Sequence, residues 1–417
     1  MHRIKKWHIQ LKWSLCVALV LGLFLVGGIR TEAEEQTTPS VNGMDARWVD
    51  VLQKLVNENS STDNPAGVEK NRELLIQEFD KLGFKPTLTE GTQGRKVVSF
   101  QKEGAKPELA LLGHLDTVFP KDSSFNQLTV DGDRLSGPGV IDMKGGIVMM
   151  LNIVDELNRT HPELAEKIRV IINDDEETGS VGTNAVLKDL TKDLKYGLVF
   201  EPGLPDGSLV TAHMGVRWLQ LDVHGKASHA GLEPQNGIDA CTEAAYKTTK
   251  LARITNYKKG PFVNPGVIQG GTKPNVVCEN ATIKMDIRFF GEKDLQRGMK
   301  RIQKITKHST IYNQSLKQGT QSELKQLAEL PPMTESSTAD LFKLAQEAGG
   351  ELGQSVTGTP VGYGSDANHL APSGLKLLVG LGPYGGGMHT DHEYMEAANY
   401  EKRLKLNLAL LKKALNK

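Results

Sequence analysis

The chain is organised around the sequence Val170-Ile171-Ile172-Asn173-Asp174-Asp175-Glu176-Glu177-Thr178-Gly179-Ser180. Its apolar beginning is typical of a buried strand, and four consecutive acidic residues follow where that strand ends. In open α/β sheets, ligands bind at this end of the strands. A cation would offset the repulsion between the carboxylates, and neighbouring acids could divide the work of holding metal and moving a proton. Taken alone, the run fits a solvated acidic loop equally well.

Length and charge narrow the class of protein. The 417 residues are too many for one ordinary domain, so we expect two. Lys plus Arg is 50 and Asp plus Glu is 50, which leaves no net charge to drive nucleic-acid binding. Outside the N-terminal segment there are two cysteines, Cys241 and Cys278, which could pair in an exported protein. Because each falls within an apolar pattern, we expect two buried free thiols.

The N-terminus has the pattern of an export signal. Basic residues precede an apolar run over 13–29, and small residues follow at the positions typical of cleavage. We therefore predict a signal peptide over residues 1–33 and a secreted or cell-envelope location. An uncleaved membrane anchor is the alternative, since the run is close to the shortest that spans a bilayer.

Other apolar strands also end in polar residues. The strand over 108–112 leads into Gly113-His114-Leu115-Asp116, and the strand over 197–200 leads into Glu201. Strands alternate with helical patterns here, which indicates a mostly parallel sheet covered on both faces. We assign residues 34–211 and 326–417 to this larger α/β domain, which we expect to carry the site.

The pattern changes after residue 211. A half-exposed strand, a helix, two strands and a second helix follow, an order that fits a small one-sided α+β domain inserted into the larger one. We place this inserted domain at residues 212–325.

Several polar residues stand after apolar strands or at helix beginnings, and they come from five separate segments. They are His114, Asp116, Asp142, Glu176, Glu177, Glu201 and His389. One such histidine or carboxylate is more often structural, but five segments ending in this way indicate one site. Nitrogen and oxygen donors without sulfur suit zinc and tolerate manganese or cobalt.

These motifs resemble those of the M20 family of dinuclear zinc peptidases, and the chain is most similar to its glutamate carboxypeptidase branch. The resemblance spans nearly all of the chain beyond the signal. It is carried by Gly-His-Leu-Asp-Thr-Val from 113, Gly-Pro-Gly-Val-Ile-Asp-Met-Lys-Gly-Gly from 137, Asp-Glu-Glu-Thr-Gly-Ser from 175, Glu-Pro-Gly from 201 and Met-His-Thr from 388. It implies a doubly wound α/β catalytic domain with an inserted ferredoxin-like lid that also serves dimerisation.

The resemblance also implies a role for each site residue. Asp142 would bridge two zinc ions, with His114 and Glu201 completing one site and Glu177 and His389 the other. Glu176 would be the general base that activates a metal-bridging hydroxide. Asp116 would accept a hydrogen bond from His114 and fix its tautomer. His392 is a rival for His389, but the family pattern favours the histidine directly after the Gly-rich loop.

Three lid residues match family positions that contact substrate. His229 would donate to the developing oxyanion, commonly in the partner subunit's site, and Asn275 and Arg288 would bind the free carboxylate. Without the resemblance, the alternative is that His229 is a turn residue after a strand and Arg288 an exposed charged residue on a strand. The loop over 361–367 resembles a further segment that lines the site.

We therefore expect an exported homodimeric zinc exopeptidase. Its substrate would be a peptide or N-acyl amino acid with a free C-terminal carboxylate, most simply glutamate. The nearest alternatives are an N-acyl-amino-acid deacylase and a dipeptidase of the same family. A catalytically inactive binding protein is the alternative from another class, and loss of a ligand or of the base would favour it. None is missing in this sequence.

Overall fold

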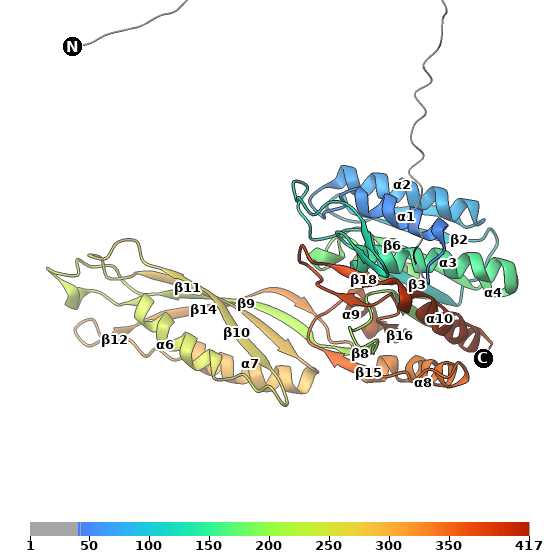
Figure 1. Cartoon of the computed structure of the whole chain (residues 1–417). Coiled ribbons are helices and arrows are strands. Elements are labelled where there is room, and N and C mark those ends of the chain that lie inside the picture. The colour runs from blue at the N-terminus through green and yellow to red at the C-terminus, as the bar shows by residue number, and fades with distance from the viewer. Residues whose placement is uncertain (1–40, 42, 417) are drawn as a thin grey trace, which may run out of the picture. The chain divides into compact units, whose positions relative to one another are not determined.

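A computed structural model describes residue 41 and residues 43–416 (Figure 1). The predicted signal peptide over 1–33 lies outside these residues. Among the residues that are described, no helix is both long enough and apolar enough to span a membrane.

The catalytic domain is built on one eight-stranded sheet. Its strands lie in the order β1 (Lys85–Glu90), β2 (Lys96–Gln101), β6 (Ile168–Asn173), β3 (Leu109–His114), β7 (Tyr196–Val199), β16 (Lys376–Val379), β8 (Leu209–His213) and β15 (Gly358–Val361). The central strands β6, β3, β7 and β16 are parallel to one another. Strand β2 pairs antiparallel with both of its neighbours, β6 and β1. Central parallel strands are buried on both faces, as the almost wholly apolar β3 required.

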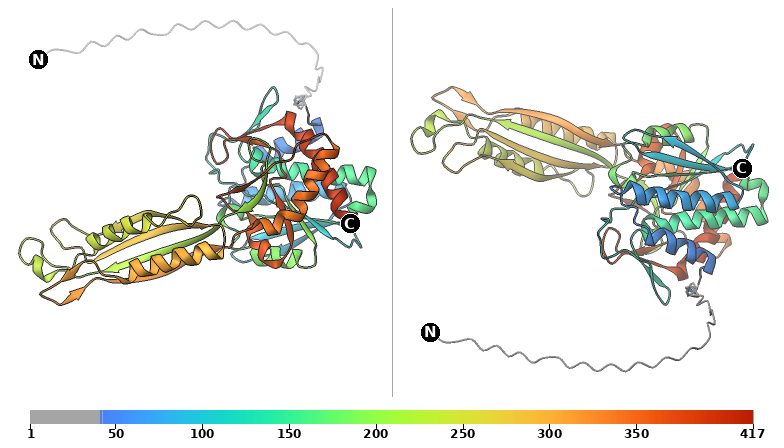
Figure 2. Two further views of the ribbon diagram at one scale, coloured as in Figure 1. Left: turned by 90° about the horizontal axis from the view of Figure 1, so that it is seen from below. Right: turned by 90° about the horizontal axis from the view of Figure 1, so that it is seen from above.

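Helices cover both faces of this sheet (Figure 2). Alternate residues of each strand point to opposite faces, so Leu109 and Leu111 join one core cluster and Ala110 and Leu112 the other. The first cluster contains residues of α1 (Ala46–Asn57), α2 (Pro65–Lys81), α3 (Gly145–Thr160), α4 (Pro162–Ala165), α8 (Glu335–Glu351) and α10 (Tyr400–Leu415). The second contains residues of α5 (Asn184–Thr191) and α9 (Asp366–Leu370).

A second, smaller sheet was not predicted. It consists of β17 (Gly385–Gly386), β18 (Tyr394–Glu396), β5 (Arg134–Ser136) and β4 (Thr129–Asp131). Strands of two or three residues show no periodicity in sequence. This sheet brings the segment after Gly387 next to the segment that precedes α3.

The inserted domain has the predicted ferredoxin-like topology. Its elements follow the order β9 (Gly215–His224), α6 (Ala240–Ala252), β10 (Phe262–Gly270), β11 (Asn280–Phe289), α7 (Glu292–Lys307) and β14 (Gln321–Leu330), with a short hairpin of β12 (Tyr312–Asn313) and β13 (Gln318–Gly319). The antiparallel sheet order is β10-β11-β9-β14. Both helices cover one face, as the two opposite views in Figure 2 show. The prediction of a doubly wound domain with an inserted lid is thus confirmed.

The lid extends beyond the boundary predicted at residue 325. Strand β14 continues to Leu330 and pairs with β9 throughout, so the last lid strand crosses that boundary. Its sequence, largely polar and mostly exposed, has no apolar run that would have revealed it. The chain then re-enters the catalytic domain beside its exit point, where the His213 N–H donates to the Met333 carbonyl at 2.9 Å.

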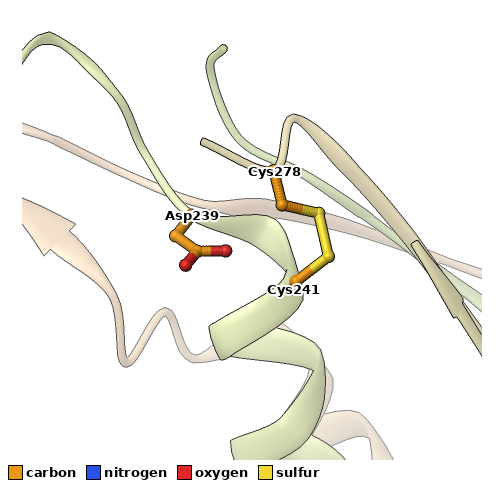
Figure 3. Close-up of side chains that lie close together, drawn as sticks. All are labelled: Asp239, Cys241 and Cys278. Carbon is orange, nitrogen blue, oxygen red and sulfur yellow. A yellow bond between two sulfur atoms is a disulfide. The ribbon is translucent and has the colours of Figure 1, made fainter. Parts of the chain in front are cut away.

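The prediction that Cys241 and Cys278 are free thiols is wrong. The two form a disulfide with Cα atoms 5.6 Å apart, joining the first turn of α6 to the loop before β11 (Figure 3). The Ala240 N–H also donates to the Cys278 carbonyl at 2.8 Å, which holds the two segments together. The apolar patterns indicated that each cysteine is enclosed, but they carry no information on which residue faces it.

Replacing both cysteines by alanine is expected to lower the free energy of unfolding by about 2–4 kcal/mol, because the crosslink restricts the unfolded chain. The crosslink spans 37 residues. Urea unfolding followed by tryptophan fluorescence, to which Trp218 on lid strand β9 contributes, measures the change. A thiol reductant should reproduce the loss in the unmodified protein and leave the double variant unaffected. Equal stability of the two proteins would contradict this expectation.

Candidate active site

The predicted site residues meet at one edge of the main sheet. His114 is the last residue of β3, and the parallel pairing of β3 with β6 aligns it with Asn173, directly before the acidic run. Strand β7 flanks β3 on the other side and leads to Glu201. Asp142 lies in the turn η1 (Val140–Lys144) that leads into α3, and His389 follows β17. Five segments distant in sequence thus converge, as the strand ends predicted.

Asp142 stands at the centre of the cluster. His114 Nε2 lies 3.2 Å from its Oδ1, and His389 Nε2 lies 3.2 Å from its Oδ2. His114 Nε2 is also 3.6 Å from Glu201 Oε1, and His389 Nε2 is 3.3 Å from Glu177 Oε2. Each oxygen of one carboxylate therefore faces a histidine–glutamate pair of its own, which is the pairing predicted from the sequence.

A glycine allows α3 to begin against the strand end that carries Glu201. A Cβ on Gly146 would lie 2.1 Å from the Phe200 carbonyl oxygen, closer than any side chain can approach. Only glycine permits this contact between the Asp142 turn and the end of β7. The paired glycines after Asp142 therefore serve the geometry of the site.

Asp116 orients His114 and also holds the acidic turn. His114 Nδ1 lies 3.0 Å from the Asp116 backbone carbonyl and 3.4 Å from Oδ1 of its carboxylate. The carbonyl is thus the closer acceptor, whereas the carboxylate was predicted. Either contact places a proton on Nδ1 and turns Nε2 toward Asp142. The carboxylate itself accepts the N–H groups of Glu176 and Glu177 at 3.1 and 3.2 Å.

The four consecutive acids divide into two structural and two site residues. Asp174 forms a buried ion pair with Arg72 and accepts the Lys96 N–H at 3.0 Å. Asp175 accepts the Gly182 N–H at 2.7 Å and closes the turn. The two glutamates that follow face the histidines instead. The repulsion among the four carboxylates is thereby reduced, because only Glu176 and Glu177 share the site.

Glu176 lies beside the first histidine. Glu176, His114 and Glu201 each place a donor atom within 4.8 Å of the others. Burial raises the pKa of Glu176 well above its usual range; the charge of His114 opposes this, while Glu201 and Asp366 raise it further. A carboxyl group with a raised pKa suits a residue that must accept a proton and later return it.

The donor set fits a pair of divalent cations. Four carboxylates and two imidazoles share the site, and buried Glu177 Oε1 has no hydrogen-bond partner among the described residues. Burial raises the pKa of Glu201 to about 7. Burial acts in the same direction on Asp142, but the two histidines outweigh it and hold its pKa below the usual range. The hydrogen bond with Asp142, helped by Glu177, raises the pKa of His389 to about 10. Oxygen and nitrogen ligands of this kind suit zinc, manganese or cobalt.

The lid residues lie on two paired loops and one strand. The backbones of His229 and Val276 form an isolated antiparallel β-bridge, and the Ala230 N–H donates to the Asn275 carbonyl at 3.0 Å. His229 Nδ1 accepts the N–H groups of residues 231 and 232, so its Nε2 carries the proton. Within the described chain, none of the hydrogen bonds of His229 or Asn275 reaches the Asp142 cluster.

Arg288 contacts the loop of the catalytic domain that was predicted to line the site. Its Nε donates to Asp286 Oδ2 at 2.9 Å and its Nη1 to the Gly362 carbonyl at 3.2 Å. The next residue, Tyr363, packs its ring edge-on against His213. Burial raises the pKa of Tyr363, and the charges of Glu201 and Asp142 raise it further, so this phenol lies within the field of the site.

Sequence reasoning missed one buried acid of the site. Asp366 accepts a hydrogen bond from Ser180 Oγ, and burial raises its pKa to about 6. It links α9 to the turn that carries Glu176, and its negative charge raises the pKa of that residue. The resemblance of the loop over 361–367 to a site-lining segment was the available signal, but it assigned no role to Asp366.

Comparisons with known proteins agree with this geometry. The chain is 28% identical over 376 residues to carboxypeptidase G2 of Pseudomonas sp. (strain RS-16), covering 87% of this chain and 88% of the relative. It is 24% identical over 266 residues to acetylornithine deacetylase of Proteus mirabilis, covering 60% and 64%. A solved tripeptidase of Staphylococcus aureus superposes with a TM-score of 0.74 at 20% identity, covering 89% and 98%, and so shares the fold.

The family match spans most of the chain. Residues 110–413 match the peptidase family M20/M25/M40, a range that includes all the residues of the Asp142 cluster. The resemblance drawn from the sequence motifs is thereby confirmed. This protein belongs to peptidase family M20/M25/M40.

Proposed function

We propose that this protein is a zinc carboxypeptidase that removes a C-terminal amino acid with a free carboxylate, glutamate above all. The observation that carries the proposal is Asp142, whose two oxygens each face a histidine at 3.2 Å. That arrangement suits a carboxylate shared by two metal ions. The carboxypeptidase activity is supported by the similarity to carboxypeptidase G2 over most of both chains. The preference for glutamate rests on the resemblance of the motifs to the glutamate carboxypeptidase branch.

The chain supplies the ligands and the proton transfer. His114 and Glu201 would hold one zinc ion, Glu177 and His389 the other, and Asp142 both. Bound zinc polarises a carbonyl group and lowers the pKa of a water molecule. Glu176 would take the proton from the attacking water and return it to the departing amine. Its enclosure beside Glu201 favours the protonated form between these two steps.

The lid would recognise the substrate. His229 has its Nε2 proton available as a donor for the developing oxyanion. Arg288 and Asn275 would bind the α-carboxylate, since a guanidinium can pair with both of its oxygens. Arg288 already contacts the loop beside the site through Gly362.

Steady-state hydrolysis of a substrate panel tests this function. The zinc-loaded protein is offered N-acyl amino acids, dipeptides and tripeptides that differ at the C-terminal residue. Higher kcat/KM for substrates with C-terminal glutamate supports the proposal. Preference for N-acetyl amino acids without a peptide requirement would favour a deacylase, the second candidate, which the similarity to acetylornithine deacetylase supports. No turnover with two metals bound would favour a binding protein.

Zinc binding is expected to release protons at neutral pH and to tighten as the pH rises. In the metal-free chain, the pKa values of His389 and Glu201 are raised to about 10 and about 7. Both groups must lose their protons to bind metal, so protons compete with zinc below these values. Calorimetric titration with zinc in buffers of different ionisation enthalpy counts the protons released. A proton count of zero, with an affinity independent of pH, would contradict the expectation.

Export and dimerisation also belong to the proposal. Disulfides persist in oxidising compartments, so the Cys241–Cys278 bond supports export. The outer lid strands β10 and β14 carry exposed apolar side chains, including Ile268 and Leu327, at the edges of the sheet. Such edges readily pair with a second copy. Light scattering after size-exclusion chromatography would measure the mass in solution.

A further inference from the structure

Glu393 is a fully buried carboxylate that has no assigned role. It follows His389 by four residues and directly precedes β18. Among the described residues, no lysine, arginine or histidine forms an ion pair with it within 4.0 Å, and its Oε2 has no hydrogen-bond partner. Burying a carboxyl group with one oxygen left without a partner is costly, so its position calls for a reason in the hydrogen bonds that it does make.

Those hydrogen bonds go to the peptide that carries Asp142. Glu393 Oε1 accepts the Ile141 N–H at 2.9 Å and the Asp142 N–H at 3.2 Å. Asp142 itself has φ −116° and ψ 91°, so the chain is not helical there. Amide groups just ahead of a helix have no partner within it and need an external acceptor. One carboxylate oxygen satisfies two of them at the centre of the site.

The backbone of Glu393 joins the same two segments. Its N–H donates to the Thr390 carbonyl at 3.2 Å, and its carbonyl accepts the Gly137 N–H at 3.3 Å. Thr390 follows His389, which has a φ of 63°, a conformation that a non-glycine residue keeps only when neighbouring contacts support it. Glu393 thus touches both the turn that carries Asp142 and the turn that carries His389, although they are separated by nearly 250 residues.

We propose that Glu393 is a positioning residue of the metal centre, whose carboxylate holds the Asp142 peptide in register with the His389 turn. The inference rests on the proposed function, because it takes the Asp142 cluster to be a site for divalent cations. Groups that orient metal ligands commonly contribute about 10- to 100-fold to metal affinity. Glu393→Ala is therefore expected to weaken zinc binding by about tenfold or more. Glu393→Gln retains a side-chain oxygen that can accept both N–H groups, so this variant should keep most of the zinc affinity.

Zinc affinity of the full chain is the readout. The metal-free protein is titrated with zinc against a chromophoric chelator, and the thermal unfolding of the metal-free protein is recorded in parallel. The matched control is Glu396→Gln, which changes an exposed glutamate on β18, the strand that directly follows Glu393. This variant should bind zinc as the unmodified protein does. If the alanine variant does not fold, Glu393→Asp, which is shorter by one methylene, takes its place and should also bind zinc more weakly.

The outcomes separate this inference from the proposed function. Weaker zinc binding by Glu393→Ala with rescue by glutamine supports the positioning role. Unchanged zinc affinity together with a lower unfolding temperature would overturn it, because Glu393 would then only stabilise the fold. Equal losses in the alanine and glutamine variants would also overturn it, since the charge rather than the two hydrogen bonds would matter. Failure of the unmodified protein to bind zinc would overturn the proposed metal centre itself.

Discussion

Glu176→Gln is expected to lower kcat by about 10²- to 10⁴-fold, the usual contribution of a general base. The amide that replaces the carboxylate has nearly the same shape but cannot take the proton from water. Glu176 lies beside His114 and Glu201 but outside the pairing centred on Asp142, so zinc content should not change. Steady-state kinetics and elemental analysis of the same samples measure the two quantities.

A glutamate at the other end of the same strand provides the control. Glu166 is exposed just before β6, and Glu166→Gln should leave kcat and zinc content unchanged. If Glu176→Gln turned over substrate as fast as this control, Glu176 could not be the base. If it lost zinc as well as activity, Glu176 would instead be a ligand.

His389→Ala is expected to remove one of two bound zinc ions and to lower kcat/KM by more than about 100-fold, above the usual effect of losing only an orienting partner. His389 is the only histidine of the described residues that pairs with both Asp142 and Glu177. Its removal leaves Glu177 without its histidine partner, while Asp142 keeps only His114 beside it. Zinc stoichiometry and kinetics on the preferred substrate of the panel test the expectation.

His392 is the matched control because it was the rival candidate in the sequence. Its ring is exposed, and its one ion-pair partner within the described part of the chain is Asp391, at 3.3 Å. His392→Ala should therefore keep both zinc ions and full activity. The opposite result, with loss of zinc only on removal of His392, would mean that the turn after Gly387 rearranges when metal binds.

The candidate site could be predicted because it lies at the ends of buried strands. Apolar runs located the strands, and the rule that parallel strands end at one edge placed His114, Glu176 and Glu201 together. Asp142 and His389 do not follow main-sheet strands. Asp142 was a candidate because it lies where a helix begins, and His389 because it follows the Gly-rich loop. The family motifs then assigned their roles, and the structure brings both to the same edge.

Other parts of the site depend on contacts that leave no local pattern. Glu393 resembles any glutamate of a polar turn, and only the small sheet of β17, β18, β5 and β4 carries it to Asp142. The partner of each cysteine was hidden in the same way, because apolar spacing reports burial and not the facing residue. For Asp116, the contact with His114 was predicted correctly, but a sequence does not distinguish a backbone carbonyl from a carboxylate as the acceptor.

The lid is one continuous insertion whose two ends lie side by side in the catalytic domain. The chain leaves the catalytic domain after His213 and returns at Met333, and these residues are hydrogen-bonded neighbours. Every member of the Asp142 cluster lies before or after this insertion, whereas Asn275 and Arg288 lie within it. A different insertion could span the same two anchors without altering the strand order around the cluster. The part of the chain that carries the proposed substrate-binding residues is therefore one continuous segment, which could be replaced without changing the proposed metal ligands.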